Sequence, residues 1–480
     1  MTTAALSHEL AAIVGDGYVH DAPSEIIAYS YDGTFQQRLP ELAVSPASTE
    51  QVAAVVKIAA GEKLPIIARG ASSGLAGGTI PERGGIILNL ARMDRILEID
   101  SANVCAVVEA GAITLQLQEA VEKVGLFYPP DPASSRQSTL GGNVACNSGG
   151  PRCLKYGVTR DYVTALTVVL ASGEVIKLGG KLTKNATGPQ LLQLFIGSEG
   201  TLGVVTEITV KLLPLPRARV TATAAFPHLA QASDAVARIM ASGILPCTLE
   251  LMDGTTINVV EDFLQAGLPR EAQALLLLEQ DGPDEAMARH DVETMAAICR
   301  DLGASSVQVA RDAAERDALW AARRSVSAAL GRLRPNKLGE DIVVPKSQVP
   351  AMIEEIGEIA RRYELPIPVF GHAGDGNLHP NILFDLRDPE EVRRVELAAR
   401  DIFRCALTLG GTLSGEHGIG TLKREFMEEA HGHTAIELAR AIKRVFDPHE
   451  LLNPGKLYPS GNGVEGFLAN LPVLAGVTPG

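Results

Sequence analysis

Two histidines stand close together in a glycine-rich stretch of the sequence. Residues 371–381 read GHAGDGNLHPN, and His372 and His379 are separated there by glycines at 374 and 376. Glycine disfavours a helix and favours a tight reversal, and a reversal brings both imidazoles to one point. Strand alternation then puts Asn381 on the same side as His379. The stretch therefore predicts a turn that gathers two imidazoles on one side.

A second glycine-flanked stretch supplies a carboxylate and a third imidazole. Residues 414–420 read SGEHGIG. Glu416 completes a set of two histidines and one carboxylate, which suits a borderline divalent metal with an open coordination position, and leaves His417 to act as a base. The spacing matches no standard zinc motif, and any one of the 10 histidines taken alone would be an ordinary satisfied polar residue. Both readings stay open at this point.

Length and composition limit the class of protein. A chain of 480 residues is too long for one core and predicts two or three domains, and 46% hydrophobic with 21% charged residues is typical of soluble globular proteins. A net charge of −14 argues against nucleic acid as a partner. We find no apolar run that would span a bilayer and no secretory signal, so a cytoplasmic location is expected. The six cysteines form no CxxC pair, which indicates neither a disulfide framework nor an iron–sulfur cluster.

The first half of the chain predicts strands and helices that lead into a glycine-dense loop. A helical lead-in, residues 1–37, precedes a strand at 42–44, a helix opened by a capping box of Ser48 and Gln51, and a strand at 64–68. Further strands are expected at 86–90, 96–99, 104–109, 163–170, 174–178 and 204–212, with a helix at 114–124. The strand at 42–44, the helix that follows it and the strand at 64–68 form a βαβ unit. This unit leads directly into RGASSGLAGG, residues 69–78.

Two loops of this half are candidates for ligand binding. The glycines of residues 69–78 would expose backbone N–H groups to a phosphate, and Arg69 adds positive charge, although a plain turn is the alternative. Residues 128–157 show neither helical nor strand periodicity. Their small polar residues differ from the charged composition of disordered segments, so we expect an ordered loop that wraps a ligand.

The second half predicts an α+β domain. A boundary falls at residues 212–219, LLPLPRAR, where prolines interrupt the strand pattern. Strands and helices from residue 220 to residue 310 then follow as two β-α-β halves of one sheet with helices on one side. A helix that contains Trp320, Arg323 and Ser327 leads to Lys337. The expected domains are 1–37, 38–217 and 218–457, followed by a tail at 458–480.

Seven motifs in order along the chain resemble those of the FAD-linked oxidases of the p-cresol methylhydroxylase and vanillyl-alcohol oxidase superfamily. They are RGASSGLAGG, PPDPASS, TLGGNVACNSGGPRCLKYGVT, FIGSEGTLGVVTEITVKLLP, HAGDGNLHPNILF, SGEHGIG and LLNPGK. The resemblance covers about residues 20–457 and is closest to the branch of glycolate oxidase, D-lactate dehydrogenase and D-2-hydroxyglutarate dehydrogenase. It implies a two-subdomain FAD-binding domain of p-cresol methylhydroxylase type, followed by a ferredoxin-like α+β substrate domain.

The resemblance implies FAD held by several loops. The pyrophosphate turn corresponds to Arg69, Gly70, Ala71, Ser72, Ser73, Gly74, Gly77 and Gly78. The wrap around the ribityl chain and the isoalloxazine corresponds to Pro132, Ser134, Ser135, Thr139, Gly141, Gly142 and Asn143. The adenine end corresponds to Glu199, Gly200 and Gly203, and Asn453 falls in the motif that returns to the flavin. Relatives with covalent flavin often carry a histidine in the first loop, whereas Ala71 or Ser72 stands here, so we expect non-covalent FAD.

The resemblance also implies a substrate site in the second domain. His372, His379 and Glu416 match a divalent metal site, usually zinc or manganese, and His417 matches the base. Groups that grip substrate carboxylates correspond to Asn381, Arg323 and Lys337. The spacing that follows Lys337 departs from the hydroxyglutarate branch, so a surface lysine stays an open alternative at that position.

The expected function is FAD-dependent oxidation of a D-2-hydroxy acid of glycolate or D-lactate type to the 2-oxo acid. The metal would assist removal of the hydroxyl proton by His417, with hydride transfer to flavin N5. Residues 263–282 resemble the glycolate oxidase side, and D-2-hydroxyglutarate is the alternative substrate. A metal-dependent hydrolase and a non-catalytic flavoprotein docking subunit are the alternatives of another class.

The resemblance is compatible with several classes of electron acceptor. Electrons would pass to an external acceptor, which is a quinone, a cytochrome, an electron-transfer flavoprotein or an iron–sulfur subunit. A homodimer and a peripheral position at the inner membrane, reached through a partner, are left open.

Overall fold

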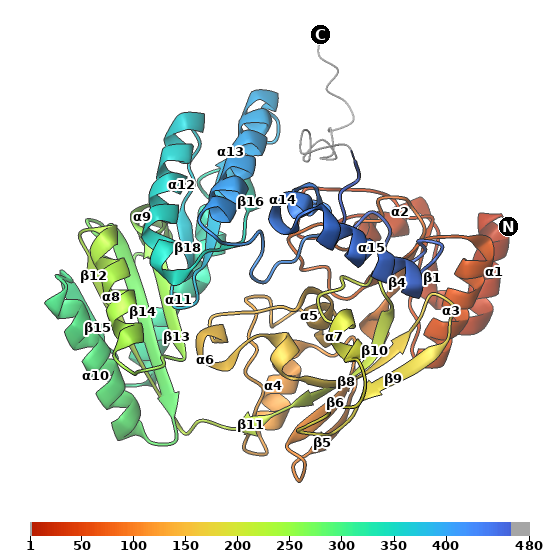
Figure 1. The fold of residues 1–480 in the computed structure, drawn as a ribbon, viewed down its shortest axis with the longest axis horizontal. Coiled ribbons are helices and arrows are strands. Elements are labelled where there is room, and N and C mark those ends of the chain that lie inside the picture. Colours follow the sequence, from red (N-terminus) through yellow and green to blue (C-terminus); the bar gives the residue numbers. More distant parts are fainter. Residues whose placement is uncertain (1, 462–480) are drawn as a thin grey trace. The chain divides into compact units, whose positions relative to one another are not determined.

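A computed structural model describes residues 2–461 of the chain (Figure 1). These residues pack into two compact units. Unit 1 contains residues 2–148, 158–215 and 416–461, and unit 2 contains residues 149–157 and 216–415. The expected domain division differs for two segments, because 149–157 packs within unit 2 and 416–457 packs within unit 1.

The first sheet of unit 1 has the strand order β1-β2-β4-β3. Its strands are β1 (Val19–His20), β2 (Leu42–Val44), β3 (Ile66–Arg69) and β4 (Ile86–Asn89). The last three strands run parallel and confirm the predicted βαβ unit, whereas β1 pairs antiparallel with β2. The lead-in is therefore not only helical: it holds α1 (Thr3–Val14) and α2 (Pro23–Ile26) and also adds this edge strand.

Helix α3 (Thr49–Glu62) begins where the sequence predicts. Its N-cap, Ser48, accepts a hydrogen bond from the backbone N–H of Gln51, and the side chain of Gln51 accepts one from the N–H of Ala47 at 2.7 Å. The valines of its inner face are fully buried and pack with α1 against the sheet. Burial of this apolar stripe fixes the strand–helix–strand unit that ends at the glycine-dense loop.

The second sheet of unit 1 is antiparallel, with the order β5-β6-β10-β8-β9. All five strands were expected from the sequence, and the hairpin of β8 with β9 is confirmed. The strands are β5 (Ile96–Asp100), β6 (Cys105–Glu109), β8 (Val163–Val169), β9 (Val175–Gly179) and β10 (Val204–Lys211). Unit 1 also contains α4 (Thr114–Glu122), the pair β7 (Leu126–Phe127) with β11 (Leu213–Pro214), α7 (Leu191–Phe195), α14 (Met427–His431) and α15 (His433–Phe446).

The long stretch at 128–157 is not a continuous loop. It holds two short helices, α5 (Leu140–Cys146) and α6 (Cys153–Tyr156). Helix α5 is capped by Thr139, and a Cβ on Gly141 would collide with Ala110 of unit 1. Gly141 therefore serves close packing rather than turning, which is why periodicity does not reveal the helix.

Unit 2 is built on an eight-stranded sheet whose main path is β15-β12-β14-β13-β18-β19-β16, with β17 paired to β19. The strands are β12 (Ala218–Phe226), β13 (Thr248–Asp253), β14 (Ala274–Gly282), β15 (Ser306–Val309), β16 (Asn336–Gly339), β17 (Ile342–Val343), β18 (Val369–His372) and β19 (Asn377–Phe384). The helices are α8 (Leu229–Ala241), α9 (Gly254–Leu264), α10 (Glu285–Asp301), α11 (Ala313–Leu330), α12 (Val349–Tyr363) and α13 (Pro389–Thr408).

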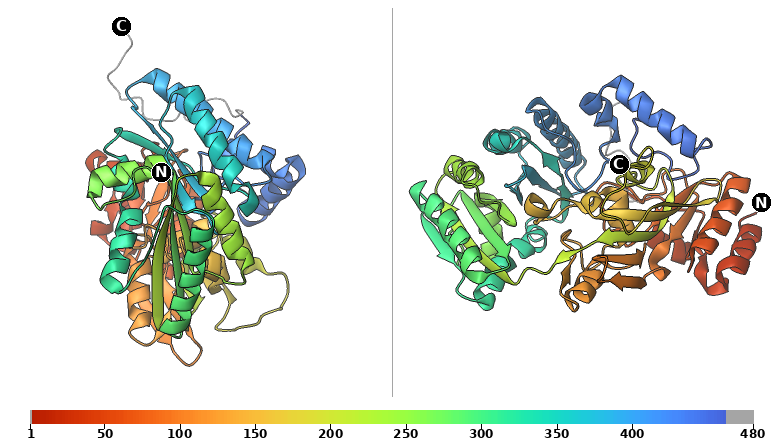
Figure 2. Two further views of the ribbon diagram at one scale, coloured as in Figure 1. Left: turned by 90° about the vertical axis from the view of Figure 1, so that its left-hand side faces the viewer. Right: turned by 60° about the horizontal axis from the view of Figure 1, so that its bottom comes forward.

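The two helices predicted between these strands, α8 and α10, contact each other and lie on one face of the sheet, as expected. Helices α9 and α11 pack on the face that carries Ala225, Met252 and Leu275. Residues of the opposite face, such as Leu276 and Leu278, are also fully buried, and α8 and α10 pack there (Figure 2). The strands are apolar on both faces, which requires cover on both, and α9 was not expected at all.

The predicted reversal at residues 371–381 is confirmed. Strands β18 and β19 form an antiparallel hairpin in which Phe370 pairs with His379 and His372 pairs with Asn377. Gly376 lies in the turn at φ +85°, a backbone conformation that residues with a Cβ rarely adopt. Both histidines consequently project from the same face of the sheet.

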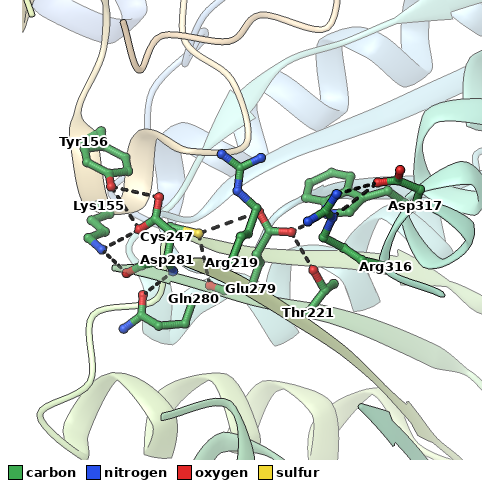
Figure 3. Close-up of polar contacts among 11 residues, drawn as sticks. Lys155, Tyr156, Arg219, Thr221, Cys247, Glu279, Gln280, Asp281, Arg316 and Asp317 are labelled. Carbon is green, nitrogen blue, oxygen red and sulfur yellow. Dashed lines mark hydrogen bonds and ion pairs between the residues drawn. The ribbon is translucent and has the colours of Figure 1, made fainter. Parts of the chain in front are cut away.

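Residues 149–157 are fastened within unit 2 by a buried carboxylate. Figure 3 shows Lys155 and Tyr156 directed at Asp281 of β14, with Lys155 Nζ at 2.5 Å and Tyr156 OH at 2.8 Å from its oxygens. The Asp281 side chain is fully buried. A buried charge requires such partners, so this contact explains why the segment leaves unit 1.

No helix among residues 2–461 is long and apolar enough to cross a membrane. Most of the expected tail, residues 462–480, lies outside the described residues.

Candidate active site

Unit 1 contains an open cavity. Its wall comes from the glycine-dense loop after β3, the segment around α5, the loop before β10 and the loop after residue 415. Four segments that are distant in sequence thus meet around one space.

Most of the residues predicted to hold a cofactor line this cavity. They are Arg69, Gly70, Ala71, Ser72, Ser73, Gly74, Gly78, Pro132, Ser134, Thr139, Gly141, Gly142, Asn143, Glu199, Gly200 and Gly203. Gly77, Ser135 and Asn453 are not part of the wall. Asn453 instead donates from Nδ2 to the backbone oxygens of Gly78 (2.8 Å) and Glu199 (2.7 Å), and so ties two wall segments together.

The guanidinium of Arg69 does not act as the free charge that the sequence indicates. Its Nη1 donates to the carbonyl of Tyr31 at 2.8 Å, and its Nη2 donates to the carbonyl of Ala28 at 3.3 Å. Burial lowers the pKa of this group. Arg69 therefore anchors the lead-in against the glycine-dense loop.

In the cavity wall, the backbone passes close to neighbouring side chains. A Cβ on Gly70 would collide with the side chain of Thr139, the N-cap of α5. Ser72 adopts φ +53°, and its hydroxyl lies 2.7 Å from that of Thr79. Glycines at these contacts bring exposed N–H groups close to the cavity, as phosphate binding requires.

Asp32 is a cavity residue that sequence reasoning missed. Its Oδ1 accepts hydrogen bonds from the N–H and hydroxyl of Thr34, whereas its Oδ2 is buried without a hydrogen-bond partner. Burial raises the pKa of this carboxyl group. A buried polar atom that faces a cavity calls for a ligand donor, so the wall fits a ligand that carries hydroxyl or N–H groups.

Glu199 connects the cavity wall to a neighbouring loop. It lines the cavity, but its carboxylate accepts the backbone N–H groups of Ile419 (2.6 Å) and Gly420 (2.8 Å). A Cβ on Gly418 would approach this carboxylate to 2.7 Å. Burial raises the pKa of Glu199, and these two N–H groups oppose that change. Glu199 thus holds the loop that carries Glu416 and His417, which line the same cavity.

Unit 2 gathers the other predicted residues on one face of its sheet. The Nε2 atoms of His372 and His379 lie 3.4 Å apart, and the two rings are nearly perpendicular at 86°. Strand pairing places Asn381 and Lys337 on the same face, since Gly339 pairs with Asn381 and Lys337 pairs with Leu383. The side of α11 that packs on this face contributes Arg323.

Glu250 of β13 fixes the orientation of the first imidazole. Its Oε1 lies 2.5 Å from Nδ1 of His372, and its Oε2 accepts a hydrogen bond from Nε of Arg323 at 2.6 Å. Burial tends to raise the pKa of Glu250, but His372 and Arg323 outweigh it and lower the pKa. An ionised carboxylate only accepts hydrogen bonds, so Nδ1 carries the proton and the lone pair on Nε2 points toward His379.

This carboxylate–imidazole pair fits a metal ligand. Protein metal sites commonly hold a histidine with a carboxylate on its second nitrogen. Asp341 lies beside the other imidazole, with its Oδ1 at 3.7 Å from Nδ1 of His379. Its Oδ2 also accepts the hydroxyl of Ser414 and the N–H of Gly415, the residue directly before Glu416.

The predicted carboxylate-gripping residues have protein contacts of their own. Arg323 stacks over Phe370 with its guanidinium carbon 4.6 Å from the ring centroid. Lys337 donates from Nζ to Ser327 at 2.8 Å, and burial lowers its pKa. Asn381 donates from Nδ2 to the carbonyl of His379 at 2.7 Å. Lys337 is half-buried, which disfavours the reading of a plain surface lysine.

Known families match both halves of the chain. The C-terminal domain of FAD linked oxidases matches residues 215–457, and an FAD binding domain matches residues 40–179. The chain is 46% identical over 459 residues to the glycolate oxidase subunit GlcD of Bacillus subtilis, across 95% of this chain and 97% of that protein. It is 36% identical over 447 residues to a D-lactate dehydrogenase of Anaerostipes hadrus, across 92% and 94% of the two chains.

The chain belongs to the FAD-linked oxidases. It is an FAD-dependent oxidoreductase, which rules out the hydrolase and the non-catalytic docking subunit. The solved structure of p-cresol methylhydroxylase with substrate bound shares the fold, with a TM-score of 0.77 at 18% identity, across 95% of this chain and 96% of that chain. The expected α+β fold class, with its two kinds of domain, is confirmed.

The sequence did not reveal the buried carboxylates that hold the candidate site residues in place. The sequence pattern gives no role to Glu250 or Asp341. A signal for Glu250 existed, because a glutamate within a strand of otherwise buried residues needs partners. Its partners come from β18 and α11, and the sequence does not show that they meet there.

We predict that Glu199→Gln slows flavin reduction and leaves the flavin bound. The amide keeps one acceptor oxygen for two N–H groups, so the loop that carries His417 loosens, and small misplacements of reacting groups cost up to about 100-fold in rate. Bound flavin is read from absorbance, and the rate is read by anaerobic stopped flow. Glu174→Gln in the exposed β8–β9 turn is the matched control. Parallel loss of flavin and thermal stability would instead assign Glu199 a structural role.

Proposed function

We propose that this FAD-linked oxidase converts a small D-2-hydroxy acid, of glycolate or D-lactate type, into the 2-oxo acid. The observation that carries the proposal is the face of unit 2 that combines His372 and His379 with a guanidinium held by Glu250. Two imidazoles suit a cation that a hydroxy acid chelates, and the guanidinium suits its carboxylate. The names of the two curated relatives point to the same substrate class.

The lining of the unit 1 cavity fits FAD. The residues that line it would hold the dinucleotide, with glycine N–H groups on its phosphates and Asp32 on a donor. Bound FAD supplies the acceptor for the two electrons that leave the substrate carbon. We propose that it is held without a covalent bond, because Ala71 and Ser72 stand in the first loop, where relatives with covalent flavin often carry a histidine.

A divalent cation, zinc or manganese, is proposed on His372, His379 and Glu416. Such an ion supplies Lewis acidity that lowers the pKa of a bound hydroxyl group. Within unit 2, Glu250 keeps the Nε2 lone pair of His372 available as a ligand. The remaining proposed ligand, Glu416, follows directly after Gly415, whose backbone N–H donates a hydrogen bond to Asp341.

The protein groups then divide the remaining work. His417 accepts the hydroxyl proton of the substrate, and Arg323 orients its carboxylate with the help of Asn381. Because Nε of Arg323 is fixed on Glu250, the plane of the guanidinium is set before the substrate arrives. Lys337 would bind the second carboxylate of D-2-hydroxyglutarate, the alternative substrate, since it lies on the same sheet face with a pKa lowered by burial.

The functional division follows the two matched families. Residues 38–217 would bind FAD and residues 218–457 would bind substrate and metal. The reduced enzyme would pass its electrons to an external acceptor, such as a quinone, a cytochrome, an electron-transfer flavoprotein or an iron–sulfur subunit.

Anaerobic flavin bleaching tests the proposal directly. Glycolate and D-lactate are expected to reduce the bound flavin, and L-lactate is expected to leave it oxidised. D-2-hydroxyglutarate competes as the alternative, and Lys337→Met should abolish reduction by that acid alone. A flavin that none of these acids reduces would refute the proposed function.

We expect His417→Ala to retain flavin and metal but to reduce its flavin about 10²- to 10⁴-fold more slowly, the usual contribution of a general base. His433→Ala is the matched control, since His433 is exposed at the start of α15. The measurement is single-turnover reduction with metal content checked by elemental analysis. An unchanged rate in the His417 variant would remove this residue from the reaction.

Chelation is expected to abolish substrate oxidation without bleaching the flavin. The cation and the flavin would have separate ligand sets, so removal of one leaves the other bound. Activity with a dye acceptor and flavin absorbance are followed during treatment with a chelator, and zinc or manganese is then added back. Activity that persists in the metal-free enzyme would make the two histidines a structural pair.

A further inference from the structure

Phe370 of β18 contacts two groups of the candidate site at once. The guanidinium carbon of Arg323 lies 4.6 Å from the centroid of its ring, and the imidazole centroid of His379 lies 5.5 Å from the same point. Phe370 and His379 are direct partners in the β18–β19 hairpin, so their side chains project from the same face of the sheet. One aromatic ring therefore lies beside both the proposed carboxylate anchor and a proposed metal ligand.

The hydrophobic core supports this ring. Phe370 packs against a buried cluster that contains Met252, its partner on β13, and Val326 of α11. Phe370 itself is half-buried, so part of its side chain remains accessible. Because protein interiors are close-packed, the ring cannot yield to a ligand without displacing these neighbours.

The contacts of Arg323 restrict where a substrate carboxylate binds. Its Nε donates to Glu250 at 2.6 Å, and Phe370 lies against the guanidinium. The two Nη groups are the part of the guanidinium that these contacts do not occupy. They suit a carboxylate in bidentate geometry, beside the aromatic ring.

The chemistry of a 2-hydroxy acid brings its reacting carbon to the same ring. That carbon carries the carboxylate, for which Arg323 is the proposed anchor, and the hydroxyl, for which the cation on His379 is proposed. Both anchors adjoin Phe370, so a carbon that is bonded to both groups lies beside the ring. One hydrogen leaves this carbon as hydride, and the remaining substituent is hydrogen in glycolate and methyl in D-lactate.

We propose that Phe370 is a specificity-determining residue: the substituent on the reacting carbon packs against its ring, which selects acids whose substituent is uncharged and no larger than a methyl group. The inference rests on the proposed function and narrows its substrate class.

Size and charge are the physical basis of this selection. A methyl group gains apolar contact with the ring, whereas a larger group has to displace a side chain that the core supports. One methylene group typically changes enzyme discrimination by about 10- to 200-fold. A second carboxylate would lose its water against an apolar ring. The ring therefore favours D-lactate over D-2-hydroxyglutarate.

A second phenylalanine of the same cluster provides a matched comparison. Phe263 of α9 is also half-buried, packs against the same buried residues and has the guanidinium carbon of Arg332 4.6 Å from its ring centroid. Arg332 is exposed and is not among the groups proposed to bind substrate. Substitutions of Phe263 thus report what the packing of such a pair contributes by itself.

Anaerobic stopped flow with the holoenzyme tests the proposal. The rate constant of flavin reduction and the dissociation constant of the acid are measured for glycolate, D-lactate and D-2-hydroxyisovalerate, whose substituents are hydrogen, methyl and isopropyl. For the unaltered enzyme, the rate constant divided by the dissociation constant should be at least about tenfold higher for D-lactate than for D-2-hydroxyisovalerate.

Two variants should move the preference in opposite directions. Phe370→Val removes the ring and should raise D-2-hydroxyisovalerate relative to D-lactate at least about tenfold. Phe370→Trp enlarges the ring and should lower D-lactate relative to glycolate at least about tenfold. Phe263→Val and Phe263→Trp, the matched controls, should leave both ratios within about twofold of the unaltered enzyme.

The outcomes separate specificity from stability and from the proposed function. Rates that fall in parallel for all three acids, or ratios that shift equally in the Phe263 variants, make Phe370 a packing residue only and overturn the inference. An unaltered enzyme that oxidises D-2-hydroxyisovalerate as well as D-lactate also overturns it, and this result needs no variant to fold. If none of the acids reduces the flavin of the unaltered enzyme, the proposed function itself fails, and the inference fails with it.

Discussion

Two buried carboxylates hold the ends of the loop at residues 414–420. Asp341 accepts a hydroxyl and an N–H from the first two residues of the loop, and Glu199 accepts the N–H groups of the last two. Glu416 and His417 stand between these supports. A loop with so many glycines has little intrinsic shape, so charge-assisted hydrogen bonds at both ends determine it. The placement of the proposed base and the proposed third metal ligand depends on them.

The same principle operates on the sheet of unit 2. Glu250 is buried in the middle of the sheet, and a buried charge persists only when it is paired. Its two oxygens are divided between His372 and Arg323, so one carboxylate sets both an imidazole tautomer and the plane of a guanidinium. Groups proposed for metal binding and for substrate binding are therefore coupled through one side chain, before any ligand is present.

Local patterns in the sequence predicted the strands, the capped helix α3 and the hairpin that pairs the two histidines. These features depend on neighbours within a few residues, through alternation, capping and glycine turns. Helix α5 escaped prediction because one of its glycines, Gly141, serves close packing against Ala110. The second layer of helices on the unit 2 sheet escaped for a related reason, since an apolar strand does not reveal how many of its faces are covered.

The sequence by itself determined the family, the FAD-binding loops and the identity of the groups that bear chemistry, because these are carried by short motifs whose residue types are set by local geometry. Only the tertiary structure decided which carboxylate serves which loop. Arg69 binds the lead-in rather than facing the cavity as a free charge, and Glu199 binds the loop after His417. Those partners lie 38 and 220 residues away along the chain, and hydrogen bonds across such separations follow from packing that no local pattern records.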